Sequence, residues 1–116
     1  TRNVITLIGT GLRDYGYNDG FVPDAKLQYP LDLNADQHGK SLWVADTYNN
    51  KIRQIELRNN LVSSVSIDCP LNQPGGLAFS DDTLYIANTN FHGIVRINLR
   101  NGNSENLNVN DEFADI

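Results

Sequence analysis

The chain has 116 residues, 40% of them hydrophobic and 20% charged, which fits one small folded domain and not a disordered segment. Its formal net charge of −5 argues against a nucleic-acid partner, because a phosphate backbone attracts a surplus of lysine and arginine. Its apolar runs are too short to span a membrane, so no membrane partner is expected. No signal peptide is visible, which leaves the compartment open and slightly favours the cytoplasm.

Short runs rich in Val, Ile, Leu, Tyr and Trp recur between clusters of Gly, Asn, Asp and Pro, which predicts an all-β chain of strands and tight turns. Most connections are short, so consecutive strands should pair antiparallel. In chain order, the predicted strands are Val4–Gly9, Leu31–Asn34, Ser41–Asp46, Lys51–Leu57, Leu61–Ile67, Gly76–Ser80, Thr83–Asn88, Gly93–Leu99 and Glu105–Val109.

One four-strand unit occurs twice in the chain. The segment SLWVADTYNNKIRQIEL, which begins at Ser41, returns as TLYIANTNFHGIVRINL at Thr83, and the strand before it repeats with Pro30 matching Pro74. A repeated antiparallel unit of about 40 residues is typical of a β-propeller blade. The second strand of each unit is apolar on both faces, as expected where neighbouring blades cover both sides, so Trp43 should be buried.

The repeat resembles the NHL repeat. LQYPLDL followed by SLWVADTYNNKIRQIEL is similar to the NHL pattern, in which the second strand ends in V-A-D-T/S-x-N-H-x-I, and the second copy keeps QPGGLAF and LYIANTN. The segment before the first copy resembles the connector of such propellers. The resemblance is to the last two blades of NHL-repeat proteins that carry a thioredoxin-like domain, and it implies blades of a six-bladed ring. The chain has no C-x-x-C motif, so no redox activity carries over.

The expected organisation is one extra outer strand followed by two four-stranded antiparallel blades. Residues 1–26 form the outer strand of a preceding blade and a connector, residues 27–68 the first blade, residues 69–110 the second blade, and residues 111–116 a tail. Two blades alone would leave an open edge and apolar faces in water. Either the remaining blades belong to a longer chain or three copies close the ring, and the extra strand Val4–Gly9 favours the longer chain.

Four loops should gather on one face of the blades: Gly9–Lys26, Thr47–Asn50, Asp68–Pro74 and Thr89–His92. Function lies on such loops more often than in strands, and tyrosine and asparagine suit recognition of a partner. The candidate binding residues are Arg13, Asp14, Tyr15, Tyr17, Asn18, Asp19, Tyr48, Asn49, Phe91 and His92. The structural alternative for the first loop is that Gly11, Gly16 and Gly20 shape turns, Asp19 caps a turn, and Phe21 fills the seam between blades.

Asp46 follows the second strand and could hold a cation together with Asp14 or Asp19. We instead expect its carboxylate to accept backbone N–H groups of the TYNN turn. Asn88, at the matching position of the second copy, preserves hydrogen bonding but has no charge, which a required metal ligand would tolerate poorly.

His92 lies near the histidine position of the NHL pattern, shifted by an inserted Phe91, and Asn50 takes that position in the first copy. A lone histidine in a turn is expected to be a hydrogen-bonding turn residue. Because His38 belongs to the opposite set of loops, the two histidines should not share a metal, and neither a metal nor another cofactor is expected.

The sequence therefore predicts a non-catalytic scaffold or interaction module that presents its loops to a protein, peptide or glycan, with the remaining blades as further partners. The alternative is one sector of a propeller enzyme, a metal-dependent lyase or hydrolase whose active site lies mostly in other blades. The inner strands offer only Asp32 toward a central channel, which disfavours catalysis in this segment. Cys69 has no evident base beside it and is expected to be a small, partly buried thiol.

Overall fold

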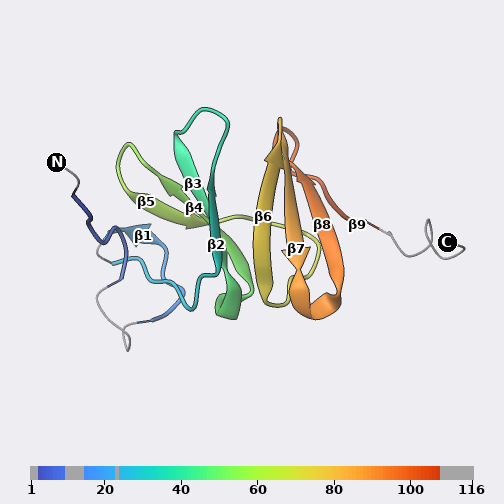
Figure 1. Cartoon of the computed structure of the whole chain (residues 1–116), viewed down its shortest axis with the longest axis horizontal. Helices are drawn as coiled ribbons and strands as arrows, with labels where there is room; N and C mark the ends of the chain where they lie inside the picture. The colour runs from blue at the N-terminus through green and yellow to red at the C-terminus, as the bar shows by residue number, and fades with distance from the viewer. Residues whose placement is uncertain (1–2, 10–14, 23, 108–116) are drawn as a thin grey trace, which may run out of the picture.

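The computed structural model of the chain describes residues 3–9, 15–22 and 24–107. Over these residues the chain forms two antiparallel sheets that stand side by side, each built from strands that follow one another along the sequence (Figure 1). The described residues contain two short 3-10 turns, η1 (Thr47–Asn49) and η2 (Thr89–Phe91), and no α-helix. Within the same residues, no helix is long and apolar enough to cross a membrane. The all-β prediction is confirmed.

The first sheet has five strands in the spatial order β1-β5-β4-β3-β2. Strands β2 to β5 form a meander, because tight turns join each to the next. Asn50 and Asn60 occupy positive φ in two of these turns, a conformation that asparagine tolerates better than most residues. The bounds are β1 (Gly20–Phe21), β2 (Asp32–Ala35), β3 (Ser41–Asp46), β4 (Lys51–Glu56) and β5 (Leu61–Ser64).

The second sheet has four strands in the order β6-β7-β8-β9. Its register repeats that of the first sheet, because Ile86 pairs with Val95 just as Val44 pairs with Arg53. The sequence repeat is therefore a structural repeat. The bounds are β6 (Pro74–Ser80), β7 (Thr83–Asn88), β8 (Gly93–Asn98) and β9 (Ser104–Leu107).

The strands predicted after the first loop are all present, and β3 and β7 have the predicted bounds. Strand β5 is shorter than predicted: it ends at Ser64, because Val65 and Ile67 leave the sheet to pack between the two sheets. The last strand covers Ser104–Leu107, and the predicted extension to residue 109 lies outside the described residues, as does the tail.

The predicted strand Val4–Gly9 is wrong, since residues 4–9 form no strand. Among the residues that the structure describes, no strand pairs with this segment, and Leu7 and Ile8 pack instead against the face of the first sheet. The extra strand is β1, in which Gly20 and Phe21 pair with Val62 and Leu61 at the outer edge of the first sheet.

The main core lies between the two sheets. Trp43 of β3 is only 8% exposed, as predicted, and its ring meets the edge of Phe79 with the ring centroids 5.7 Å apart. Cys69 is partly buried against this cluster, also as predicted. The buried members of the cluster are Trp43, Ala45, Ile52, Leu77, Leu84, Ile86, Val95 and Ile97. Burial of this apolar surface is the main force that holds the sheets together.

A second cluster covers the opposite face of the first sheet. Val44, Ile55 and Val62 project from the strands, and Ala25 packs on them from the connector. Strand β3 is therefore covered on both faces, as its sequence predicted.

Among the described residues, three hydrogen bonds tie the sheets together near their inner strands. The hydroxyl of Thr47 donates to the carbonyl of Pro74 at 2.8 Å, and the backbone N–H of Gln73 donates to the side-chain oxygen of Asn50 at 2.8 Å. The third bond runs from the N–H of Leu77 to the carboxylate of Asp32. Together with the core, these bonds fix the relative placement of the two sheets.

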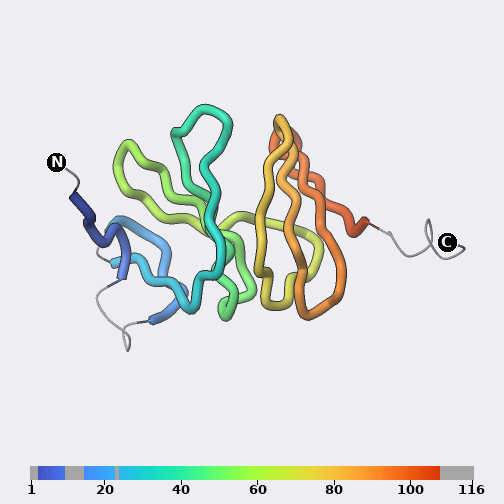
Figure 2. The backbone as a smooth tube through the Cα atoms, viewed as in Figure 1, coloured from blue at the N-terminus to red at the C-terminus, as the bar shows by residue number. Residues whose placement is uncertain are grey.

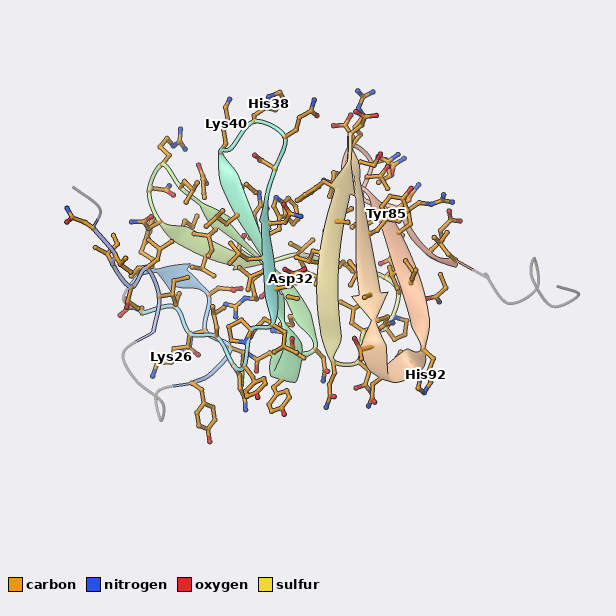
Figure 3. All side chains as sticks on the ribbon, in the orientation of Figure 1. Lys26, Asp32, His38, Lys40, Tyr85 and His92 are labelled. Atoms are coloured by element: carbon orange, nitrogen blue, oxygen red, sulfur yellow. The ribbon has the colours of Figure 1, made fainter. Side chains whose placement is uncertain are left out.

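The described parts of the four predicted loops lie at one end of the sheets, the lower end in Figures 1 and 2, which we call the rim. Figure 3 shows His38 at the opposite end and His92 at the rim, so the predicted separation of the two histidines is confirmed.

Candidate functional site

The rim brings together most of the candidate residues that the structure describes. Tyr15 and Tyr17 project from the connector, Tyr48 belongs to η1, and Phe91 belongs to η2, and more than half of each of these side chains is exposed. Arg13 and Asp14 lie outside the described residues. The rim is therefore rich in exposed aromatic rings, each carried by a short turn or connector on a rigid sheet.

Arg53 is the anchor of the rim on the first sheet. Its side chain is fully buried, and one terminal nitrogen donates to the Asp46 carboxylate and to the carbonyl of Lys26, both at 2.8 Å. The other terminal nitrogen donates to the carbonyl of Asn18 at 2.8 Å and to Asp19 at 2.7 Å. One guanidinium thus joins strand β4 to the middle of the connector, at Asn18 and Asp19, and to its last residue, Lys26. Its Nε has no hydrogen-bond partner among the described residues.

The Asp46 carboxylate accepts hydrogen bonds, as predicted, but its partners differ from the predicted backbone N–H groups. Its carboxylate accepts the backbone N–H of Gln28 at 2.7 Å and the side-chain amide of Asn49 at 2.7 Å, besides Arg53, and not the backbone of the following turn. The reason is geometric: η1 folds its backbone into a 3-10 turn, and the connector crosses over the end of β3 instead. The same amide group of Asn49 donates to the carbonyl of Gly16 at 2.6 Å.

The second sheet makes the corresponding hydrogen bonds with an uncharged side chain. Asn88 stands where the first sheet has Asp46, and its side-chain oxygen accepts the N–H of Asn72 at 2.8 Å. Its amide nitrogen donates to the carbonyl of Pro70 at 2.9 Å, the bond that Arg53 makes to Lys26 in the first sheet. The predicted equivalence of Asp46 and Asn88 is confirmed.

Asp19 does not cap a turn, as its structural alternative had it, but links Arg53 to the outer strand. It accepts the hydroxyl of Ser64 at 3.0 Å as well as the Arg53 guanidinium. Burial by itself would raise the pKa of Asp19, but the hydrogen bonds from Arg53 and Ser64 and the charge of Arg53 outweigh it and lower the pKa. Phe21 sits on edge strand β1, paired with Leu61, and is exposed in this chain.

Two tyrosines stack on one another beside η1. The rings of Tyr29 and Tyr48 lie with centroids 4.5 Å apart and planes 11° apart. Nearby, the amino group of Lys51 lies 5.2 Å from the centre of the Tyr17 ring, within cation–π range. Tyr17 belongs to the connector, and Tyr29 lies in the segment between the connector and β2. Tyr48 belongs to η1, and Lys51 is the first residue of β4.

On the second sheet, Phe91 and His92 occupy η2 and its C-terminal cap. His92 has φ of 56° and donates its backbone N–H to Thr89, as Asn50 does to Thr47 with φ of 57°. The two turns therefore have the same length, and the idea that Phe91 is inserted is wrong: it stands in the place of Asn49. Phe91 and His92 also line a cavity of about 620 Å³ together with Pro70 and Leu107.

Asp32, the only candidate toward a central channel, is engaged between the sheets. One oxygen accepts the N–H of Leu77 at 2.8 Å and the other accepts the N–H of Leu33 at 2.9 Å (Figure 3). Among the described residues, no group of three or more His, Cys, Asp or Glu side chains could hold a metal ion.

Sequence reasoning missed the anchor role of Arg53 and the ring pair of Tyr29. Arg53 falls in phase with Ile55 on the inward face of its strand, and that alternation marks a buried charge. Tyr29 had no local signal, because its backbone conformation and its stacking partner depend on the turn at residues 47–49.

No family model matches the chain. In an alignment of 100 residues that covers 73% of the chain, it is 35% identical to NHL repeat-containing protein 2 of Homo sapiens, and 34% identical to the protein of that name from Bos taurus. Over 65 residues, 56% of the chain, it is 42% identical to Protein SUPPRESSOR OF QUENCHING 1, chloroplastic, of Arabidopsis thaliana. The chain spans 14% of the length of the first two proteins and 6% of the plant protein.

Proposed function

Because the chain is a segment of NHL repeats, homologous over most of its length to NHL repeat-containing protein 2, we propose that its two sheets are neighbouring blades of a β-propeller. The segment acts there as a non-catalytic interaction module that binds a protein, peptide or glycan through the rim. The observation that carries this proposal is the gathering of exposed aromatic side chains at one end of two rigid sheets.

The propeller is supported by the way the sheets pack. Trp43 of the first sheet packs against Phe79 of the second sheet, and the two residues lie on faces that are not equivalent in the repeat. Tyr85 is the counterpart of Trp43, and it lies on the face of the second sheet that turns away from the first (Figure 3). A third blade that packs in the same way would cover Tyr85.

The first sheet also has apolar surface for a neighbour. Leu31 and Leu33 of the inner strand region are both more than half exposed, and they line an apolar cavity of about 460 Å³ together with Leu7 and Val44. Further blades would bury this surface, supplied either by the same polypeptide or by other copies. The mass of the chain in solution distinguishes these two sources of the missing blades. A mass of three copies would point to closure by symmetry, and a monomer or aggregate would point to blades of one polypeptide.

The binding role can be tested by crosslinking in the intact protein. A photoreactive residue in place of the exposed Tyr15 should trap a defined partner, whereas the same residue in place of His38, at the opposite end, should not. Equal trapping at both ends would contradict a binding role for the rim.

A further inference from the structure

Tyr29 occupies a backbone conformation that tyrosine rarely adopts. Its φ is 55°, in the left-handed region that glycine or asparagine enters at much lower cost. The matching residue of the second sheet, Gln73, has φ of 52°, so the fold imposes this conformation at both places. The fold does not impose an aromatic ring there, because the second sheet forms with glutamine.

The same comparison applies to the partner ring. Tyr48 and its counterpart Asn90 make the same backbone contact, since each donates its N–H to the carbonyl of the residue just before the strained position, Gln28 and Asn72 respectively. Only the first sheet has tyrosine at both positions. The stacked pair therefore replaces a polar pair on an identical backbone, and it leaves Tyr29 60% and Tyr48 51% exposed. An exposed ring pair that the fold does not need points to a binding function.

The polar groups beside the pair are already engaged. The side-chain amide of Asn49 donates both of its hydrogens, to Gly16 and to Asp46, and the carboxylate of Asp46 accepts from three groups. These neighbours have little capacity left for the hydroxyl groups of a sugar. What the surface offers is flat ring area, on which a guanidinium group or a proline ring can stack.

Charge favours a basic partner. The chain has a formal net charge of −5. The Tyr17 ring already has a cation beside it, the amino group of Lys51, whereas no cation covers the Tyr29–Tyr48 pair among the described contacts. The net negative charge of the chain attracts an arginine side chain, whose planar guanidinium can stack on the uncovered rings.

We propose that the Tyr29–Tyr48 pair is a docking site for an extended, basic peptide segment in which arginine and proline alternate. The arginine guanidinium stacks on the outer face of the ring pair, and proline keeps the segment extended so that little conformational freedom is lost on binding. This proposal rests on the proposed function, because it names the partner that the rim binds.

The test uses the intact protein and a fluorescent synthetic peptide of alternating arginine and proline. The double variant Tyr29→Gln with Tyr48→Asn installs the residues that the second sheet has at the same positions, so the backbone should fold as before. The matched control is His38→Gln at the opposite end. We expect saturable binding to the parent, at least about tenfold weaker binding to the double variant, and unchanged binding to the control.

Three outcomes would overturn the proposal: no binding of the arginine–proline peptide to the parent, equal binding to the double variant, or equal binding of a glutamate–proline peptide of the same length. Binding of chitohexaose that the double variant abolishes, without peptide binding, would overturn it in favour of a glycan. Each of these results leaves the crosslinking test at Tyr15 unaffected, so failure of this proposal is distinguishable from failure of the proposed function.

Discussion

The first sheet can be converted into the chemistry of the second at two positions. Asp46→Asn and Arg53→Val give the first sheet the residues Asn88 and Val95 that the second sheet carries at the matching places. Each single substitution separates a buried ion pair whose two side chains are both fully buried. Removal of one partner from such a pair typically costs about 3–5 kcal/mol, because the other charge stays buried without compensation.

The double substitution should cost less than the two single ones together. An asparagine at position 46 can donate to the carbonyl of Lys26, as Asn88 donates to that of Pro70, and no buried charge is left. The pair should therefore show a coupling free energy of about 1–3 kcal/mol in a double-mutant cycle. The bonds from Arg53 to Asn18 and Asp19 are lost in either case, so the double variant should remain somewhat less stable than the parent.

Hydrogen exchange of the β4 amides in the intact protein measures this cycle locally. The single variant Arg53→Val should speed exchange by about a hundredfold or more, since 1.4 kcal/mol corresponds to a factor of ten. Additive effects within about 0.3 kcal/mol would refute the reasoning, because they would mean that Asp46 and Arg53 do not depend on each other. An exchange rate for Arg53→Val within threefold of the parent would refute it as well.

Three further predictions concern the core, the connector and the open face. Trp43→Ala should cost about 3–5 kcal/mol in urea unfolding, because Trp43 fills the space beside Phe79, and a loss under about 1 kcal/mol would mean that the two sheets do not pack as described. Asp19 has a lowered pKa in the fold, so its stabilisation is complete above its unfolded pKa and is lost as the pH falls through the folded value. Below about pH 4, the free energy of opening at Gly20, measured by hydrogen exchange, should therefore fall by no more than about 1 kcal/mol, because the pair is half exposed. Asp19→Asn should remove this pH dependence. Leu33→Glu should destabilise the intact protein by several kcal/mol if another blade covers Leu33, and a change under about 0.5 kcal/mol would show that this face is open to water.

The strands were predictable because their signals are local and repeated. Alternating apolar residues mark the strands, and the asparagines of the turns supply positive φ at Asn50 and Asn60. The strand at Val4–Gly9 failed for the opposite reason. Its residues have strand composition, but a strand requires a hydrogen-bonding neighbour, and composition alone cannot supply one.

The candidate site was predictable in place and less so in detail. The repeat indicated which loops share the rim, so the loops that carry Tyr17, Tyr48 and Asn49 were correctly placed at the same end. The partners of these residues depend on where the connector crosses β3, and that path is set by the buried guanidinium of Arg53. A pattern reading assigns Arg53 to a surface because arginine is seldom fully buried. The sequence signal for its burial is that Arg53 and Ile55 alternate with polar residues and therefore share one face of the strand.

The two sheets act as controls for each other, and this separates what the fold requires from what a partner requires. Where both sheets carry the same interaction by different means, as with Asp46 and Asn88, the interaction belongs to the fold. Where one backbone carries tyrosine in the first sheet and a polar residue in the second, the backbone by itself does not require the tyrosine. Tyr29 meets this condition in a conformation that makes tyrosine a costly choice. Ring stacking offsets part of that cost, and the exposure of both rings leaves surface for the partner proposed above.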